Sequence, residues 1–258
     1  HQTMRMIRAE AKGPPAEAPA APEVQVFNRE AYACVQTEAE LDRWIAEARL
    51  AGIIAVDTET DALDSIGAGL VGVSLAIAPN QACYIPLAHG GSDLFSDAPQ
   101  QVPMATAIAK LKPLLEDPAV LKIGHNIKYD LNVLARHNIH VAPVDDTMVM
   151  SFDLDAGLRN HGMDELALAH FEHSCLSFKD VCGSGKNQLT FNQVGLREAT
   201  AYAAEDADVT LRLWHRLKPR LHAAQTTRVY ERVDRPLIPV LAQMERHGIK
   251  VDRDELAR

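Results

Sequence analysis

Two acidic residues follow an apolar run in the first quarter of the chain. Asp57 and Glu59 stand two positions apart, directly after the apolar residues 53–56. Such a run predicts a strand that is covered on both faces. Side chains two positions apart on a strand point to the same face, so both carboxylates can reach one cation. The pair alone leaves open a solvated strand edge or a helix cap.

Two further segments carry an acidic residue at helical spacing. Asn126 and Asp130 are four positions apart, where a strand is expected to end at residue 124 and a helix to begin near Asn126. Tyr202 and Asp206 have the same spacing in an alanine-rich segment. Residues four apart share one face of a helix. Locally, an Asn cap with a surface Asp is the alternative for the first pair, and a core Tyr with a solvated Asp is the alternative for the second.

Clustered carboxylates suit hard divalent cations such as Mg²⁺, which prefer oxygen ligands. Two such ions roughly 3.5–4 Å apart can serve both the attacking and the leaving oxygen in the hydrolysis of a phosphodiester. The net charge of −9 argues against a chain that holds nucleic acid by bulk electrostatics. It is compatible with a site where cations meet the phosphate.

The elements around these residues predict an α/β fold. Residues 37–50 fit an amphipathic helix that Thr37 and Glu40 begin with a capping box and Gly52 ends. Residues 70–77 and 82–87 predict an antiparallel pair of strands. Short strands are expected at 24–27 and 120–124, helices at 104–115, 127–137, 145–152, 162–171 and 196–217, and a polar, Gly-rich excursion at 179–193. This order is typical of one mixed sheet with helices around it.

The two ends of the chain differ from its middle. Residues 1–22 are rich in Pro and Ala and predict a linker or tail. Residues 223–258 contain a helical pattern interrupted by Pro236 and Pro239 and predict the start of a following domain. No apolar run reaches the roughly 18 residues of a membrane span, and no signal peptide is evident. The four scattered cysteines are expected to be reduced thiols, as in a cytoplasmic protein.

In order and spacing, the three acidic segments resemble the motifs of the DEDD exonuclease superfamily, in its tyrosine-bearing branch. These are residues 56–61, 126–130 and 202–208. Residues 161–167, 185–193 and 235–252 look like signatures of the family A polymerases, of the bacterial DNA polymerase I type. Asn160 departs from some relatives, which have Arg there. The resemblance covers residues 24–258 and implies a ribonuclease H-like mixed β-sheet flanked by helices in a 3′→5′ exonuclease domain at 23–222, before a truncated polymerase domain.

The resemblance also implies a mechanism, the hydrolysis of the 3′-terminal phosphodiester of single-stranded DNA with release of nucleoside 5′-monophosphates. Asp57 would bridge two divalent cations, Mg²⁺ or, in its place, Mn²⁺ or Zn²⁺. Glu59 and Asp206 would hold the cation that activates water, and Asp130 would act on the second through water. Tyr202 would orient the attacking water with Glu59 as its partner.

Three more residues are expected to contact the substrate. By resemblance, Leu63 wedges the terminal bases, Phe178 stacks on a base and Asn126 lies near the terminal nucleotide. Packing in the core is the alternative for Leu63 and Phe178. The implied partners are a single-stranded DNA 3′ end and the polymerase domain of the same chain. A monomer without membrane contact or polymerase activity is expected.

Two other functions compete with proofreading. An RNA exonuclease of the RNase D kind shares the same motifs, but the polymerase-like segment after residue 221 and residues 186–193 argue against it. A catalytically silent scaffold of a polymerase is the second alternative. The presence of all four carboxylates and Tyr202 argues against that one.

Overall fold

The computed structural model describes residues 26–90, 98–185 and 188–256. Within them a six-stranded sheet has the order β1-β4-β3-β2-β5-β6. β3 is antiparallel to β2 and β4, and the other neighbours are parallel. The predicted α/β fold with a mixed sheet is thus confirmed. The strands are β1 (Ala33–Cys34), β2 (Ile53–Thr60), β3 (Leu70–Ala78), β4 (Gln81–Pro86), β5 (Leu121–Gly124) and β6 (Val144–Asp146).

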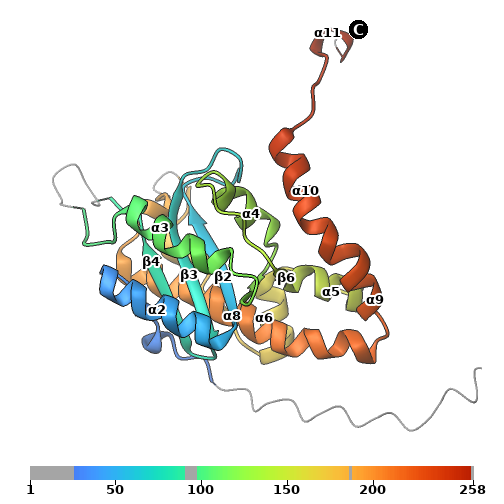
Figure 1. The fold of residues 1–258 in the computed structure, drawn as a ribbon, viewed down its shortest axis with the longest axis horizontal. Coiled ribbons are helices and arrows are strands. Elements are labelled where there is room, and N and C mark those ends of the chain that lie inside the picture. The colour runs from blue at the N-terminus through green and yellow to red at the C-terminus, as the bar shows by residue number, and fades with distance from the viewer. Residues whose placement is uncertain (1–25, 91–97, 186–187, 257–258) are drawn as a thin grey trace, which may run out of the picture.

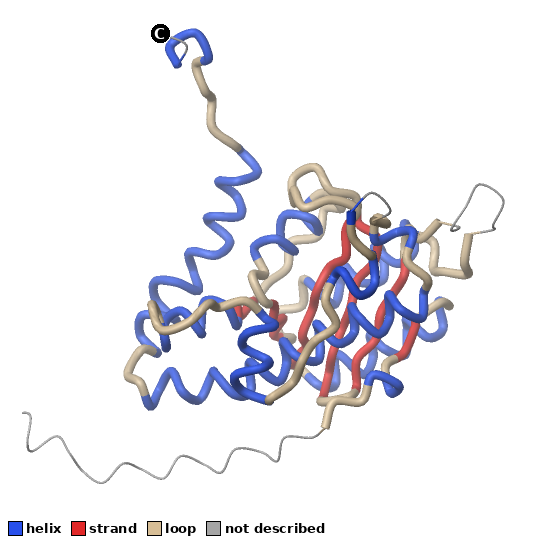
Figure 2. The backbone as a smooth tube through the Cα atoms, turned by 180° about the vertical axis from the view of Figure 1, so that it is seen from behind, coloured by secondary structure: helices blue, strands red, loops and turns tan. Residues whose placement is uncertain are grey.

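Helices cover both faces of this sheet. Figure 1 shows α2 (Glu38–Ala51) and α3 (Met104–Leu115) in front of the strands and α8 (Leu196–Ala223) behind them. Ile54 and Val56 of β2 belong to the core on the α2 and α3 side, whereas Ala55 packs with Ala204 and Ala207 of α8. Because alanine side chains are small, α8 approaches the sheet closely. Figure 2 gives the same arrangement from behind.

The remaining elements lie at the ends and edges of the sheet. Within the described part of the chain, no helix is both long and apolar enough to cross a bilayer. Near the end of the chain, α10 runs beside α4 and then leaves the body of the domain (Figure 1). These elements are η1 (Arg29–Ala31), α4 (Lys128–Ala135), α5 (Thr147–Asp155), α6 (Met163–Phe171), α7 (Phe178–Cys182), η3 (Phe191–Gln193), α9 (Thr227–Val229), the π-helical turn η4 (Tyr230–Asp234), α10 (Arg235–His247) and α11 (Arg253–Leu256).

Local signals in the sequence set several element ends. The predicted capping box of Thr37 and Glu40 forms at the start of α2, and Gly52 ends that helix in the left-handed region at φ +70°. The helix predicted at 145–152 was wrong at its start, because residues 144–146 form β6. Asp146 caps α5 instead, since its side chain accepts hydrogen bonds from the backbone N–H groups of Met148 and Val149.

The strand predicted at 24–27 was wrong in its described part. Val26 and Phe27 have no strand partner, and residues 24–25 lie outside the described residues. The Phe27 ring instead stacks on His173, with 3.7 Å between ring centroids. The strand next to β4 at this edge of the sheet is instead β1, which runs parallel to it. The linker predicted at 1–22 also lies outside the described residues, and all four cysteines are free thiols.

Candidate active site

The first two acidic residues lie inside β2 rather than beyond its end. The strand continues past the apolar run to Thr60, so Asp57 pairs with Ser74 and Glu59 with Gly72 of β3. Asp57 and Glu59 lie two and four positions after Ala55, whose side chain packs against α8. Their carboxylates therefore point to the α8 face of the sheet, as strand periodicity predicts. The register shifts just after Glu59, where the chain leaves the sheet.

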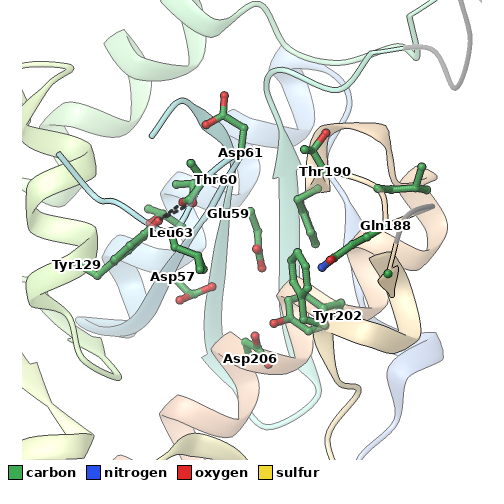
Figure 3. A pocket seen from close by; sticks show the side chains of 16 residues that line it. Asp57, Glu59, Thr60, Asp61, Leu63, Tyr129, Gln188, Thr190, Tyr202 and Asp206 are labelled. Atoms are coloured by element: carbon green, nitrogen blue, oxygen red, sulfur yellow. Dashed lines mark hydrogen bonds between the residues drawn. The ribbon is translucent and has the colours of Figure 1, made fainter. Parts of the chain in front are cut away.

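The third acidic residue comes from α8. One carboxylate oxygen from each of Asp57, Glu59 and Asp206 lies within 4.8 Å of the others. Figure 3 shows these side chains converging on one cavity. Oxygen ligands at this separation can share a divalent cation. The structure thus brings together three of the four predicted metal-ligating residues.

The other acidic residues of the same helical segment face different partners. Glu205 accepts a hydrogen bond of 2.7 Å from Nε of Arg29, and Asp208 forms an ion pair of 2.9 Å with Arg212. Asp206 has no ion pair among the described residues. Because successive residues of a helix point in different directions, Glu205 and Asp208 form ion pairs elsewhere, whereas Asp206 points into the cavity.

Asp130 lies apart from the three clustered carboxylates. It belongs to α4, on the opposite face of the sheet, and accepts a hydrogen bond of 2.5 Å from the hydroxyl of Thr58. Both residues are buried. Asp130 remains close enough for its charge to raise the pKa of Glu59. The sequence did not single out a role for Thr58, although its place between Asp57 and Glu59 was a usable signal.

The electrostatics of the cluster favour a cation. Burial raises the pKa of Asp57 to about 7. Burial, and then the neighbouring charge of Asp57, raise the pKa values of Glu59 and Asp206 above the usual carboxyl range. Like charges held together resist ionisation until an opposite charge joins them. No described residue that lines the cavity is positively charged, so these carboxylates fit a divalent cation.

Tyr202 lines the same cavity one helical turn before Asp206. Its ring lies 5.7 Å from that of Phe191 and 6.5 Å from that of Phe178, centroid to centroid. Burial and the charge of Asp206 raise the pKa of Tyr202, so its hydroxyl keeps the proton and can donate it in a hydrogen bond. Among the described residues, the expected hydrogen bond between Tyr202 and Glu59 is not formed.

A cavity of about 690 Å³ lies over the carboxylates. Leu63 and Phe178 stand at its walls with 98% and 41% of their surface exposed, so neither is a core residue. Aromatic and aliphatic surface at the mouth of an acidic cavity can contact nucleotide bases. The other described residues that line it are Thr58, Thr60, Asp61, Ala62, Tyr129, Gly185, Gln188, Leu189, Thr190 and Phe191.

The position of Asn126 differs from the prediction. Its φ of +59° places it in the left-handed region, and α4 begins only at Lys128. Asn126 and Asp130 therefore do not share a helix face, because the helical spacing rule does not apply across that turn. Asn126 is exposed, and the described lining of the cavity does not include it.

Tyr129 is a second residue whose role the sequence did not reveal. Its hydroxyl donates a hydrogen bond of 2.8 Å to the carbonyl oxygen of Ala62 and lies 2.6 Å from the hydroxyl of Thr60. It thereby ties α4 to the segment that carries Leu63 (Figure 3). The available signal was its place next to Asp130.

The chain is similar in sequence to known proteins. The profile of a 3′-5′ exonuclease family matches residues 32–222. DNA polymerase I of Rhizobium leguminosarum is 51% identical over 245 residues, which cover 90% of this chain and 24% of that protein. DNA polymerase I of Pseudomonas aeruginosa is 43% identical over 229 residues, which cover 87% and 25%. The chain thus spans about a quarter of the length of the curated relatives it matches.

The fold is shared more widely. The structure of Escherichia coli RNase D, an exoribonuclease involved in structured RNA processing, aligns with a TM-score of 0.59 at 18% identity, over 86% of this chain and 51% of that one. This likeness confirms the predicted ribonuclease H-like fold of DEDD exonucleases. Together with the family match and the polymerase relatives, it leads to one conclusion. The chain belongs to the 3′-5′ exonuclease family, and it is similar to a part of bacterial DNA polymerase I.

Proposed function

We propose that this domain removes nucleotides from the 3′ end of single-stranded DNA by hydrolysis with two divalent cations, releasing nucleoside 5′-monophosphates. The observation that carries the proposal is the group of Asp57, Glu59 and Asp206, whose carboxylate oxygens lie within 4.8 Å of one another. All-oxygen ligands favour Mg²⁺, with Mn²⁺ or Zn²⁺ as substitutes. In a DNA polymerase I, of the kind that the chain resembles, the corresponding role would be proofreading.

Each carboxylate has a proposed part in holding the cations. Asp57 would contact both, Glu59 and Asp206 would hold the one nearer the attacking water, and Asp130 would act on the other through water. When bound, such cations activate water and stabilise the leaving oxygen. The contact with Thr58 supports the role of Asp130, because it fixes the direction of a carboxylate that lies outside the main cluster.

Tyr202 is proposed to orient the attacking water rather than to remove its proton. A tyrosine hydroxyl is a poor base near neutral pH, and burial raises the pKa of Tyr202 further. Its position one turn from Asp206, on the wall of the cavity, supports donation of a hydrogen bond to a water held by the carboxylates.

The substrate is proposed to be held by stacking more than by charge. Leu63 and Phe178 expose apolar surface at the cavity, and stacking on an aromatic ring tolerates any base. The described lining offers no positive side chain for phosphate. We therefore expect the separate domain to bind single-stranded DNA weakly. A contact between Asn126 and the terminal nucleotide stays a prediction.

Residues 223–258 are proposed to begin the polymerase domain. The family match ends at residue 222, and α10 exposes a row of apolar side chains, including Leu237, Val240 and Met244. Both observations support a segment that packs against further chain. A monomeric state and a cytoplasmic location stay predictions.

A matched pair of oligonucleotides distinguishes this function from its alternatives. Single strands of DNA and RNA with the same sequence and a 5′ label are incubated with the protein and Mg²⁺. We expect a ladder that shortens from the 3′ end, faster for DNA, and its abolition by EDTA. Preference for RNA would favour an RNase D-like enzyme, and inactivity on both would favour a silent scaffold.

A further inference from the structure

One face of α4 holds the loop formed by residues 61–69, which carries Leu63. Tyr129 and Arg136 donate hydrogen bonds to the carbonyl oxygens of residues 62 and 68. Between them, the amide of Asn132 donates to the hydroxyl of Ser65 over 3.4 Å. These three helix positions are three and four apart and so lie on one face. The loop is thus attached to α4 along its whole length.

Asn132 also contacts α10, which packs against α4. Its Nδ2 donates a hydrogen bond of 2.9 Å to Oε2 of Glu245, and Nη1 of Arg246 donates one of 2.8 Å to its Oδ1. Glu245 additionally forms an ion pair with Lys128, one turn earlier on α4. The side chain of Asn132 therefore joins two helices and the loop.

Burial makes these contacts interdependent. Asn132 is completely buried, and a buried amide that loses a hydrogen-bond partner is strongly disfavoured. Its donors and acceptor are all engaged by Ser65, Glu245 and Arg246. A displacement of α10 must therefore change how Asn132 holds the loop.

We propose that Asn132 is a positioning residue through which α10 fixes loop 61–69, and with it Leu63, beside the carboxylates. Leu63 is 98% exposed, so its place depends on how the loop is held rather than on packing of its own side chain. Because α10 leads out of the exonuclease domain (Figure 1), its position is transmitted to the substrate side of the site. This inference rests on the proposed function, since Leu63 acts only if the cavity receives a single strand.

A charge exchange at two positions tests the contact. Asn132→Asp places a carboxylate against that of Glu245, and the two repel. Adding Glu245→Gln restores the pairing, because the carboxylate at position 132 then accepts hydrogen bonds from the amide at position 245, from Arg246 and from the hydroxyl of Ser65. Gln243→Ala, at an exposed position of α10, is the matched control.

Hydrogen exchange gives a readout that needs no catalysis. We expect amides of residues 62–68 to exchange about tenfold faster in Asn132→Asp, while those of α8 are unchanged, since local opening reports local stability. The double variant and Gln243→Ala should match the unsubstituted protein. Unchanged exchange in the loop of Asn132→Asp would overturn the proposal.

Steady-state kinetics separates positioning from general damage. In Asn132→Asp we expect the KM for a single-stranded oligonucleotide to rise about tenfold, a change worth about 1.4 kcal/mol, with recovery in the double variant. Hydrolysis of the nitrophenyl ester of thymidine 5′-monophosphate, a diester too short to need Leu63, should stay within about twofold. Equal losses on both substrates would contradict positioning. Inactivity of the unsubstituted protein on both would defeat the proposed function, while hydrogen exchange still decides the inference.

Discussion

The hydroxyl of Thr58 donates a hydrogen bond of 2.5 Å to the carboxylate of Asp130. This contact joins β2, which carries Asp57 and Glu59 on one face, to the helix on its other face. The strand therefore presents two carboxylates directly and orients a third through the residue between them. The short alternation of acidic and hydroxyl side chains in β2 serves both faces of the sheet.

Replacing Thr58 tests whether this contact orients Asp130. Thr58→Val removes the donor from a buried carboxylate, which should lower the free energy of unfolding by about 1–3 kcal/mol and slow 3′-end hydrolysis. Thr58→Ser keeps the hydroxyl and should retain both properties. Thermal unfolding and initial rates in Mg²⁺ measure the two effects. Equal behaviour of the Val and Ser variants would show that the contact is dispensable.

The pH dependence of stability without metal tests the electrostatics of the cluster. Burial raises the pKa of Asp57 from 3.8 to about 7, so the folded state retains a proton that the unfolded chain has released. Stability from this group is present below about pH 4 and is lost as pH rises to about 7. In EDTA, the unfolding temperature should therefore fall between about pH 4 and about pH 7.

Two additions make that experiment specific. Mg²⁺ should remove much of the loss, because a bound cation compensates the ionised carboxylates. Asp57→Asn should flatten the profile in EDTA. A fall of equal size in the Asn variant would assign the effect to other groups.

Replacing Phe178 tests the proposed stacking contact with the substrate. Phe178→Ala should raise the KM for single-stranded DNA about tenfold, since stacking on one base contributes roughly 1–3 kcal/mol, with a smaller effect on kcat. Phe178→Tyr keeps the ring and should stay close to the unsubstituted protein. An unchanged KM in the Ala variant would remove Phe178 from the substrate site.

Replacing Gly72, which pairs with Glu59 in the sheet, tests the packing beneath the carboxylates. A Cβ at this position would lie 2.1 Å from the hydroxyl oxygen of Tyr84, so Gly72→Ala must displace a buried ring. We expect a loss of about 1–3 kcal/mol in the free energy of unfolding. Gly90→Ala, where a Cβ meets no atom within 4 Å, is the control. Equal stability of the two variants would contradict this packing.

The sequence predicted the parts of the site that depend on regular periodicity. Asp57 and Glu59 share a face because β2 is a regular strand, and Tyr202 and Asp206 share one because α8 is a regular helix. Asn126 did not follow the helical rule, because a left-handed residue ends that periodicity. Element type was thus predictable from the pattern, whereas the conformation of a single turn residue was not.

Contacts between distant segments could not be predicted in the same way. Asn132 reads as an ordinary polar helix residue, yet it is fully buried because its partners lie on α10, 113 and 114 positions later. Phe27 likewise lies in a segment whose residue types predict a strand, but its ring stacks on His173. Such positions depend on tertiary packing, which local patterns do not contain.

Release of the 3′-terminal nucleotide from a 5′-labelled single-stranded DNA in Mg²⁺ tests the central claim most directly. The unsubstituted protein, Asp206→Asn and Glu172→Gln, which alters an exposed carboxylate, are compared at equal concentration. We expect Asp206→Asn to lose at least about a hundredfold in rate, because metal stabilisation of the transition state contributes several kcal/mol, and Glu172→Gln to be unaffected. An Asp206→Asn rate within about threefold of the unsubstituted rate, which is under 1 kcal/mol, would contradict the account.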